Sequence, residues 1–266
     1  MIKFRDIPYE RPDTDSIKAQ IQELTDILKA SGSYGEARDA FLRKDALMRH
    51  VTSVATVAQI RHSIDTTDRF YDEEELFWNR AMPELQEYLD RWTRAMCNSR
   101  FRKELEEEFG EVVFLNAELE LKSFDPAIIP LMQQENDITM EYEKLLASAH
   151  IPFRGKTYTI SRMGPFKSAA DDSLRLEAWK AEGGWYRDNK EKLDDLYDRA
   201  VAVRHSMSRE LGLRDYVELG YYRMGRNCYD RNDVGKFREA VRRYVVPVAD
   251  SIKRRQAERQ IGRAHV

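Results

Sequence analysis

Hydrophobic side chains recur along most of the chain at intervals of three and four residues, the spacing that places them on one face of an α-helix. The first run follows a helix start signal at Asp15-Ser16 and ends at Gly32. The second continues without proline from about Tyr34 to Ile64. A third begins near Asp72, where three consecutive glutamates suit the positive end of a helix dipole, and Pro83 inside it is expected to kink it. These segments predict long helices packed side by side.

The spacing changes only once, in residues 151–166. There the side chains from Phe153 to Ile160 alternate around Gly155 and lead to Gly164-Pro165, which predicts one small β-hairpin. The other helical runs predict helices at about 99–109, 111–121, 126–149, 169–186 with a break at Gly183-Gly184, 191–211, 215–222 and 230–260. The predicted fold class is therefore mainly α, with long packed helices and one small β-hairpin near 151–166. The hairpin is the natural boundary between an amino-terminal helical domain, 1–150, and a second helical portion, 151–260.

Composition narrows the class of protein. With 266 residues, 42% hydrophobic and 34% charged, the chain can build a sizeable core. Its 44 basic and 47 acidic residues give a net charge of −3, so we expect neither nucleic acid nor an anionic membrane as partner. No apolar run approaches the roughly 20 residues that span a bilayer. Cys97 and Cys228 form no C-x-x-C pair and no signal peptide precedes them, which predicts a cytoplasmic location.

The histidines do not assemble a metal site. A catalytic zinc typically has three protein ligands, usually including histidines one helical turn apart. His50 and His62 are twelve residues apart on one predicted helix, so at about 1.5 Å per residue they are roughly 18 Å apart and cannot share a metal. His150 is expected to cap a helix end, and we assign His205 a structural role. His265 has no partner at ligand spacing either, so no metal ligand is assigned.

Other catalytic chemistries also lack their residues. The sequence contains no G-x-S-x-G elbow and no glycine-rich phosphate loop, and neither cysteine has a catalytic signature around it. Adjacent carboxylates such as Glu106-Glu107-Glu108 do not face one another on a helix. The basic residues of the last helix are mixed with acidic ones, as expected of a solvated face. We therefore assign no catalytic and no cofactor-binding residue.

One segment, residues 196–230, is more distinctive. It reads Leu196-Tyr197-Asp198-Arg199-Ala200-Val201-Ala202-Val203-Arg204-His205 and continues to Gly212, Asp215-Tyr216 and Leu219-Gly220-Tyr221-Tyr222-Arg223-Met224-Gly225-Arg226-Asn227-Cys228-Tyr229-Asp230. Locally it predicts a helix that ends at Gly212, a short helix that ends at Gly220, and a turn rich in tyrosine and arginine. The segment resembles the oligoendopeptidase F branch of the thimet oligopeptidase family of zinc metallopeptidases. The resemblance extends more loosely to the opening helices, the hairpin at 153–165 and the helix at 241–256.

This resemblance implies a mostly helical fold with a deep channel between two halves, in which short peptides are cleaved. In such enzymes an H-E-x-x-H helix and a downstream glutamate bind zinc, and the glutamate of the motif activates the metal-bound water. None of those positions occurs in this sequence. We therefore expect the amino-terminal portion of a zinc-dependent metalloendopeptidase, inactive alone and without bound zinc, while the full-length enzyme binds zinc and short peptides. Residues 223–229 are candidates for the channel wall.

The end of the chain adds a further expectation. The resemblance stops at Gln260, and residues 261–266, Ile-Gly-Arg-Ala-His-Val, resemble the translation of a common sequencing adapter. We interpret them as an artefact and the chain as an incomplete peptidase fold, cut before its chemistry. The last helix is then expected to expose an apolar stripe that includes Val245, Val248 and Ile252, which predicts self-association. The alternative is a complete, non-catalytic helical interaction module on a peptidase-like scaffold.

Overall fold

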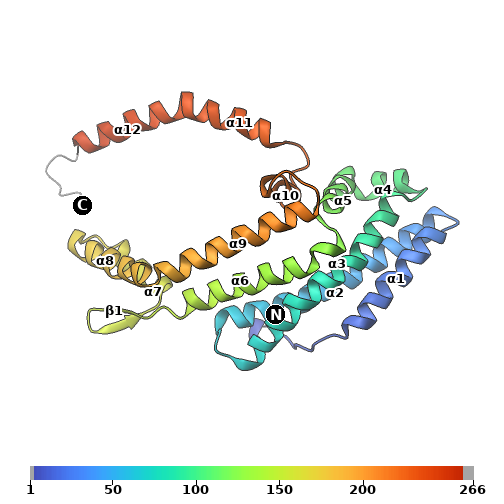
Figure 1. The fold of residues 1–266 in the computed structure, drawn as a ribbon, viewed down its shortest axis with the longest axis horizontal. Helices are drawn as coiled ribbons and strands as arrows, with labels where there is room; N and C mark the ends of the chain where they lie inside the picture. Colours follow the sequence, from blue (N-terminus) through green and yellow to red (C-terminus); the bar gives the residue numbers. More distant parts are fainter. Residues whose placement is uncertain (1–2, 260–266) are drawn as a thin grey trace.

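The computed structural model describes residues 3–259, and its secondary structure is almost entirely helical (Figure 1). The interpretation of residues 261–266, with His265 among them, lies outside the described residues. The α-helices are α1 (Thr14–Ala30), α2 (Tyr34–Ile64), α3 (Arg69–Cys97), α4 (Arg102–Phe109), α5 (Glu111–Ser123), α6 (Ile129–Ala147), α7 (Ile160–Lys167), α8 (Asp172–Asp188), α9 (Lys190–Glu210), α10 (Tyr216–Arg223), α11 (Arg231–Ala240) and α12 (Val246–Arg259). The remaining elements are strands β1 (Ile151–Phe153) and β2 (Lys156–Tyr158), 3-10 turns at Phe4–Asp6 and Pro126–Ile128, and a π-helical turn at Val241–Val245. The predicted fold class is confirmed.

Side chains that accept hydrogen bonds from the first backbone N–H groups explain where several helices begin. Ser33 caps α2, whose two ends agree with the sequence prediction. The third helix starts at Arg69, three residues earlier than predicted, because Asp68 accepts bonds from the N–H groups of Phe70 and Tyr71. Pro83 lies inside α3, and the helix continues through it.

Helices α1, α2 and α3 pack against one another around the largest apolar core. Its fully buried side chains include Ile21, Val51, Leu85, Trp92 and Phe114, each at most 1% exposed. Burying a side chain of this size contributes about 1.5–3 kcal/mol. The short helices α4 and α5 extend the same core at one end of the bundle (Figure 1). Helices α6 and α10 in turn pack against this bundle, through α3 and α5 respectively.

The β-hairpin is shorter than predicted. Ile151 pairs with Tyr158 and Phe153 with Lys156 in an antiparallel ladder, and the two-residue turn between the strands is Arg154-Gly155, both with positive φ. The sequence prediction extended the hairpin to residue 166, but residues 160–167 form α7. Met163 and Phe166 of this helix pack with Ile151, Phe153 and Ala178 in a separate small core. Tertiary packing therefore outweighs the turn preference of Gly164-Pro165.

Helix α8 also differs from the prediction, because it is continuous through Gly183-Gly184. Neither glycine has a positive φ. The buried carboxylate of Glu182 pairs with the ammonium of Lys167 at 2.7 Å, and Ala181 and Trp185 pack on the small core. Contacts on both sides of the glycine pair therefore keep the helix intact, at a cost of about 1 kcal/mol per glycine relative to alanine.

Helix α6 connects the two helical portions of the chain. It packs against α3 on one side and α9 on the other (Figure 1). A third core, formed by Phe124, Ile128, Met207 and Leu219, joins the start of this region to α9 and α10. The proposed boundary at residue 150 falls between α6 and β1, and it stays a prediction.

Residues 231–259, which we call the arm, extend from the end of α10 and arch over α9 (Figure 1). Its three helical elements pack extensively only on one another, and α11 and the π-helical turn have no buried residue. The π-helical turn ends two residues before Pro247, which lacks the backbone N–H that a regular helix uses there. Val245, Val248 and Ile252 are 55%, 58% and 42% exposed, as the sequence predicted.

None of the helices between residues 3 and 259 combines the length and the apolar character needed to cross a lipid bilayer.

Candidate functional site

The turn between α10 and α11 is the part of the predicted channel wall with the most defined geometry. Gly225 has a φ of 62°, a left-handed conformation that glycine adopts without steric cost. The guanidinium of Arg226 lies 4.2 Å from the ring centre of Tyr221 and 5.6 Å from that of Tyr229. Such cation–π contacts contribute about 0.5–1 kcal/mol each at exposed sites. The turn is thus ordered by its own arginine and tyrosines.

Contacts with neighbouring elements hold the turn at both ends. The side-chain amide of Asn227 donates to the amide oxygen of Asn116 in α5 at 2.7 Å. Arg231, at the start of the arm, pairs with Asp215 at 2.8 Å, and this pairing lowers the pKa of the Asp215 carboxyl. Asp230 and Asp233 form a capping box that starts α11. The direction in which the arm leaves the body is therefore set by polar contacts on either side of the turn.

A buried carboxylate on α6, that of Glu135, holds α10 in place. Glu135 of α6 is 7% exposed, and its two oxygens accept hydrogen bonds from Arg204 of α9 at 2.6 Å and from Arg223 of α10 at 2.8 Å. Burial raises the pKa of Glu135, but the bonds and positive charges of the two arginines outweigh it, and the net effect is a lowered pKa. We call these three residues the Glu135 clamp. It joins three helices and places Arg223 at the entrance to the turn.

Two open hollows flank the turn. One, of about 440 Å³, is lined by Arg226, Tyr229, Asp233, Val234 and Phe237, and so lies at the base of the arm. The other, of about 370 Å³, lies between α3, α5, α6 and α10, with Arg223 and Gly225 on its wall. The first combines aromatic surface with one cation and one carboxylate. Both are large enough to receive a side chain.

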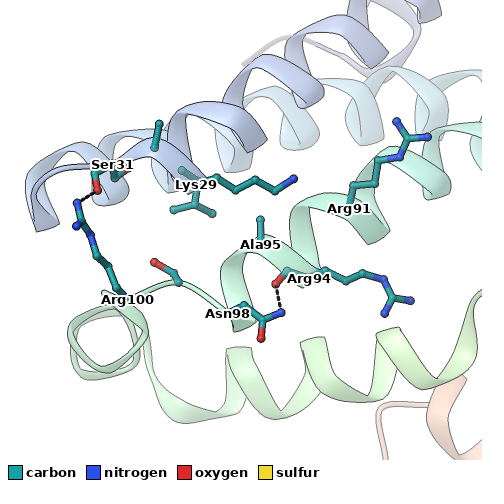
Figure 2. Close-up of a pocket in the computed structure, with 10 residues that line it drawn as sticks. Lys29, Ser31, Arg91, Arg94, Ala95, Asn98 and Arg100 are labelled. Carbon is teal, nitrogen blue, oxygen red and sulfur yellow. Dashed lines mark hydrogen bonds between the residues drawn. The ribbon is translucent and has the colours of Figure 1, made fainter.

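A third hollow, at the ends of α1 and α3, is explained by helix termination (Figure 2). Arg100 donates to the backbone carbonyl of Ser31, just after α1, and the side-chain amide of Asn98 donates to the carbonyl of Arg94 at 2.8 Å. The guanidinium of Arg94 pairs with Asp90 at 2.7 Å. Basic side chains near helix C-termini are stabilised by the negative end of the helix dipole. This hollow is a capped corner of the bundle.

The histidines lie on separate parts of the structure. His50 is exposed on α2, and His150 is exposed with its Nδ1 2.5 Å from the carbonyl oxygen of Ser148, at the end of α6, where capping was predicted. His62 is buried, with Nε2 3.3 Å from Oδ1 of Asp72, an aspartate that also pairs with Lys144. Within residues 3–259 no three histidine, cysteine, aspartate or glutamate side chains gather as a metal site would require. The described residues therefore do not fit a zinc site, and the location of any metal ligands stays a prediction.

The side chains around the turn can bind and position a ligand, but they include no nucleophile activated by a base. Sequence reasoning selected residues 223–229 but missed Glu135. A signal for it exists: Ile128, Met132, Glu135 and Ile138 fall on one face of a helix, so Glu135 is an acid on an apolar stripe. A buried acid of this kind requires a cationic partner.

The comparisons with known proteins agree with this architecture. Residues 4–124 match the model of the Peptidase M3 N-terminal domain. A solved structure assigned as an oligoendopeptidase F is 37% identical, with a TM-score of 0.93, over 97% of this chain and 46% of its own. PZ peptidase A, solved with an inhibitor, is 36% identical with a TM-score of 0.93 over 98% of this chain and 46% of its own. A structure assigned as an oligoendopeptidase F from Bacillus anthracis str. Ames is 33% identical, with the same TM-score, over 98% and 48%.

These matches define a helical module of a peptidase. The chain matches the N-terminal domain of the M3 peptidase family over residues 4–124, and its fold is that of the amino-terminal helical portion of oligoendopeptidase F. It spans about half the length of the solved structures it matches. No curated protein matches the chain at a significant level.

Proposed function

We propose that the chain supplies the amino-terminal helical half of a zinc-dependent endopeptidase that hydrolyses short peptides. The observation that carries the proposal is the match of 97% of the chain, at a TM-score of 0.93 and 37% identity, to an oligoendopeptidase F of about twice its length. In this proposal the zinc ligands and the general base belong to the half that the chain does not span. The chain alone is then inactive.

The chain's own contribution is a scaffold for substrate. The Glu135 clamp and the Arg226 contacts hold the turn and the two hollows beside it in one geometry. We assign this surface to the wall of the peptide channel, where aromatic side chains and Arg226 suit a short peptide with apolar residues and a free carboxylate. Preorganised walls of this kind lower the entropy cost of positioning a flexible substrate.

The two cysteines support a cytoplasmic location, because Cys97 and Cys228 are both free and burial raises the pKa of the Cys97 thiol. Cys97 is half-buried, and a thiol with a raised pKa is less reactive than one with an ordinary pKa.

A reconstitution assay tests the proposal. The purified chain is assayed with zinc and quenched-fluorescence peptides of about ten residues, first alone and then joined in one polypeptide to the unmatched half of the 37% identical oligoendopeptidase F. We expect cleavage only by the joined protein, and its loss with a chelator. Zinc-dependent cleavage by the chain alone would contradict the assignment of the catalytic groups to the other half. A folded joined protein that binds peptides without cleaving them would favour the alternative, a non-catalytic interaction module.

A further inference from the structure

The arm carries a continuous apolar stripe. Phe237, Val241, Val245, Val248 and Ile252 follow one another at intervals of three and four residues, which places them on one helix face, and we call them the arm stripe. Phe237 is 68% exposed, and the other four are half-buried or exposed. Contiguous exposed apolar surface of this kind is uncommon on a free-standing protein and marks an interaction site.

The arm has few contacts with the body. Residues 231–259 are held to the rest of the described chain by the turn at 224–230 and by the Arg231–Asp215 pair. The matches to solved peptidases cover 97% or 98% of the chain, so they include most of the arm. Those peptidases are about twice as long, and the same arm is therefore present where a second half of the protein is available to cover it.

The charge of the arm differs from that of the rest of the chain. Residues 231–258 contain eight basic and four acidic side chains, whereas the whole chain has a net charge of −3. The basic residues Arg238, Arg242 and Arg243 lie between positions of the arm stripe in the sequence, and all three are exposed. A surface that docks here is favoured if its apolar centre is flanked by acidic groups.

We propose that the arm stripe is the docking surface for the half of the M3 peptidase fold that this chain does not span, and that this half presents an apolar seam flanked by acidic side chains. The proposal rests on the proposed function in its choice of occupant. Phe237 also lines the hollow at the base of the arm, so the docking surface adjoins the wall assigned to the peptide channel and does not include the hollow itself. Buried aromatic side chains carry much of the energy of an interface.

The test measures association of the full 266-residue chain with the unmatched half of the 37% identical oligoendopeptidase F as a separate polypeptide. Sedimentation velocity and titration calorimetry report stoichiometry and affinity. We expect a one-to-one complex, and a loss of affinity of about tenfold or more for Phe237→Ser and for Val248→Ser, since each removes a large apolar contact. Asp250→Ser is the control, because Asp250 is exposed on α12 outside the stripe, and removing its negative charge does not weaken docking to a seam flanked by acidic groups.

The variants leave the body of the protein intact, because neither Phe237 nor Val248 belongs to one of its apolar cores. Unchanged circular dichroism checks this. The joined polypeptide provides a second measurement, in which the serine variants lower the thermal midpoint and Asp250→Ser does not. The proposal is overturned by no complex, by a complex and a midpoint insensitive to the serine variants, or by a chain dimer that these variants dissociate. A complex that depends on the stripe but cleaves no peptide leaves the docking surface standing and refutes the proposed function.

Discussion

Replacing Glu135 by glutamine removes the charge of the clamp while keeping its size. The carboxylate is 7% exposed and accepts one hydrogen bond from each of two arginines, at 2.6 and 2.8 Å. Hydrogen bonds to charged groups contribute about 1.5–3 kcal/mol each, and breaking a buried ion pair costs about 3–5 kcal/mol. The side chains of Arg204 and Arg223 are 43% and 34% exposed, so they regain water when the charge is lost. We therefore expect a loss of about 2–3 kcal/mol in the free energy of unfolding for Glu135→Gln.

Glu141→Gln is a matched control on the same helix. Glu141 accepts two hydrogen bonds from Arg199, at 2.7 and 2.9 Å, but its side chain is 49% exposed. Exposed pairs contribute about 0.2–1 kcal/mol, so this variant is expected to lose less than about 1 kcal/mol. Urea unfolding followed by circular dichroism at neutral pH measures both. A loss for Glu135→Gln no larger than that for Glu141→Gln would refute the reasoning.

The stability difference between the wild type and Glu135→Gln is also expected to depend on pH. Because the pKa of Glu135 is lowered in the folded state, its stabilisation is fully present above the unfolded value of about 4.3 and is lost as the pH falls through the folded pKa. The difference in unfolding free energy between the wild type and Glu135→Gln is therefore largest at neutral pH and narrows below about pH 4. A difference that stays constant from pH 7 to pH 3.5 would contradict the assignment of the lowered pKa to this carboxyl.

Three further substitutions test other parts of the structure. Phe114→Ala, at a fully buried core position, is expected to lower the free energy of unfolding by about 3–5 kcal/mol, measured with urea. Val112 is 58% exposed on the same helix, and Val112→Ala is expected to change it by less than about 0.5 kcal/mol. Equal losses would contradict the placement of the core. Gly225→Ala is expected to cost about 1 kcal/mol through its φ of 62°, since an added Cβ meets nothing closer than 3.8 Å; a neutral effect on the thermal midpoint would argue against the left-handed turn. Asp230→Ala removes the N-cap of α11, worth about 1 kcal/mol, and should speed hydrogen exchange in residues 231–240 while leaving α9 unchanged; unchanged exchange in the arm would show that the capping box is dispensable.

The helices were predictable where their signals are local. α2 begins after Ser33, whose side chain caps it, and its apolar spacing continues to Ile64. Each end of this helix is therefore determined by residues close to it in the sequence. The errors occur where distant contacts decide the conformation. Gly164-Pro165 has the composition of a turn, yet packing of the surrounding residues on α8 makes it helical. Gly183-Gly184 has the composition of a helix break, yet α8 continues through it.

In the candidate site, too, the features with local sequence signals were predicted and those that depend on distant contacts were not. The turn at 224–230 was found from its tyrosine, arginine and glycine residues, all close together in the sequence. The Glu135 clamp was not found, because Arg204 and Arg223 lie 69 and 88 residues away from Glu135, and no local pattern pairs a buried acid with a particular arginine. Its position on the apolar face of α6 was visible in the sequence, but its partners depend on how α9 and α10 pack.

The attachment of the arm at a single turn makes it a mechanical lever. Its 29 residues have a contour of about 43 Å at 1.5 Å per helical residue, so a rotation of about 10° at the turn displaces the far end by at most about 7 Å. The angle is set by the backbone conformation of Gly225 and by two contacts of about 3 Å, the Asn227–Asn116 hydrogen bond and the Arg231–Asp215 ion pair. Small changes in those contacts are thus amplified several-fold at the far end of α12, so that the geometry near Gly225 determines where this end lies.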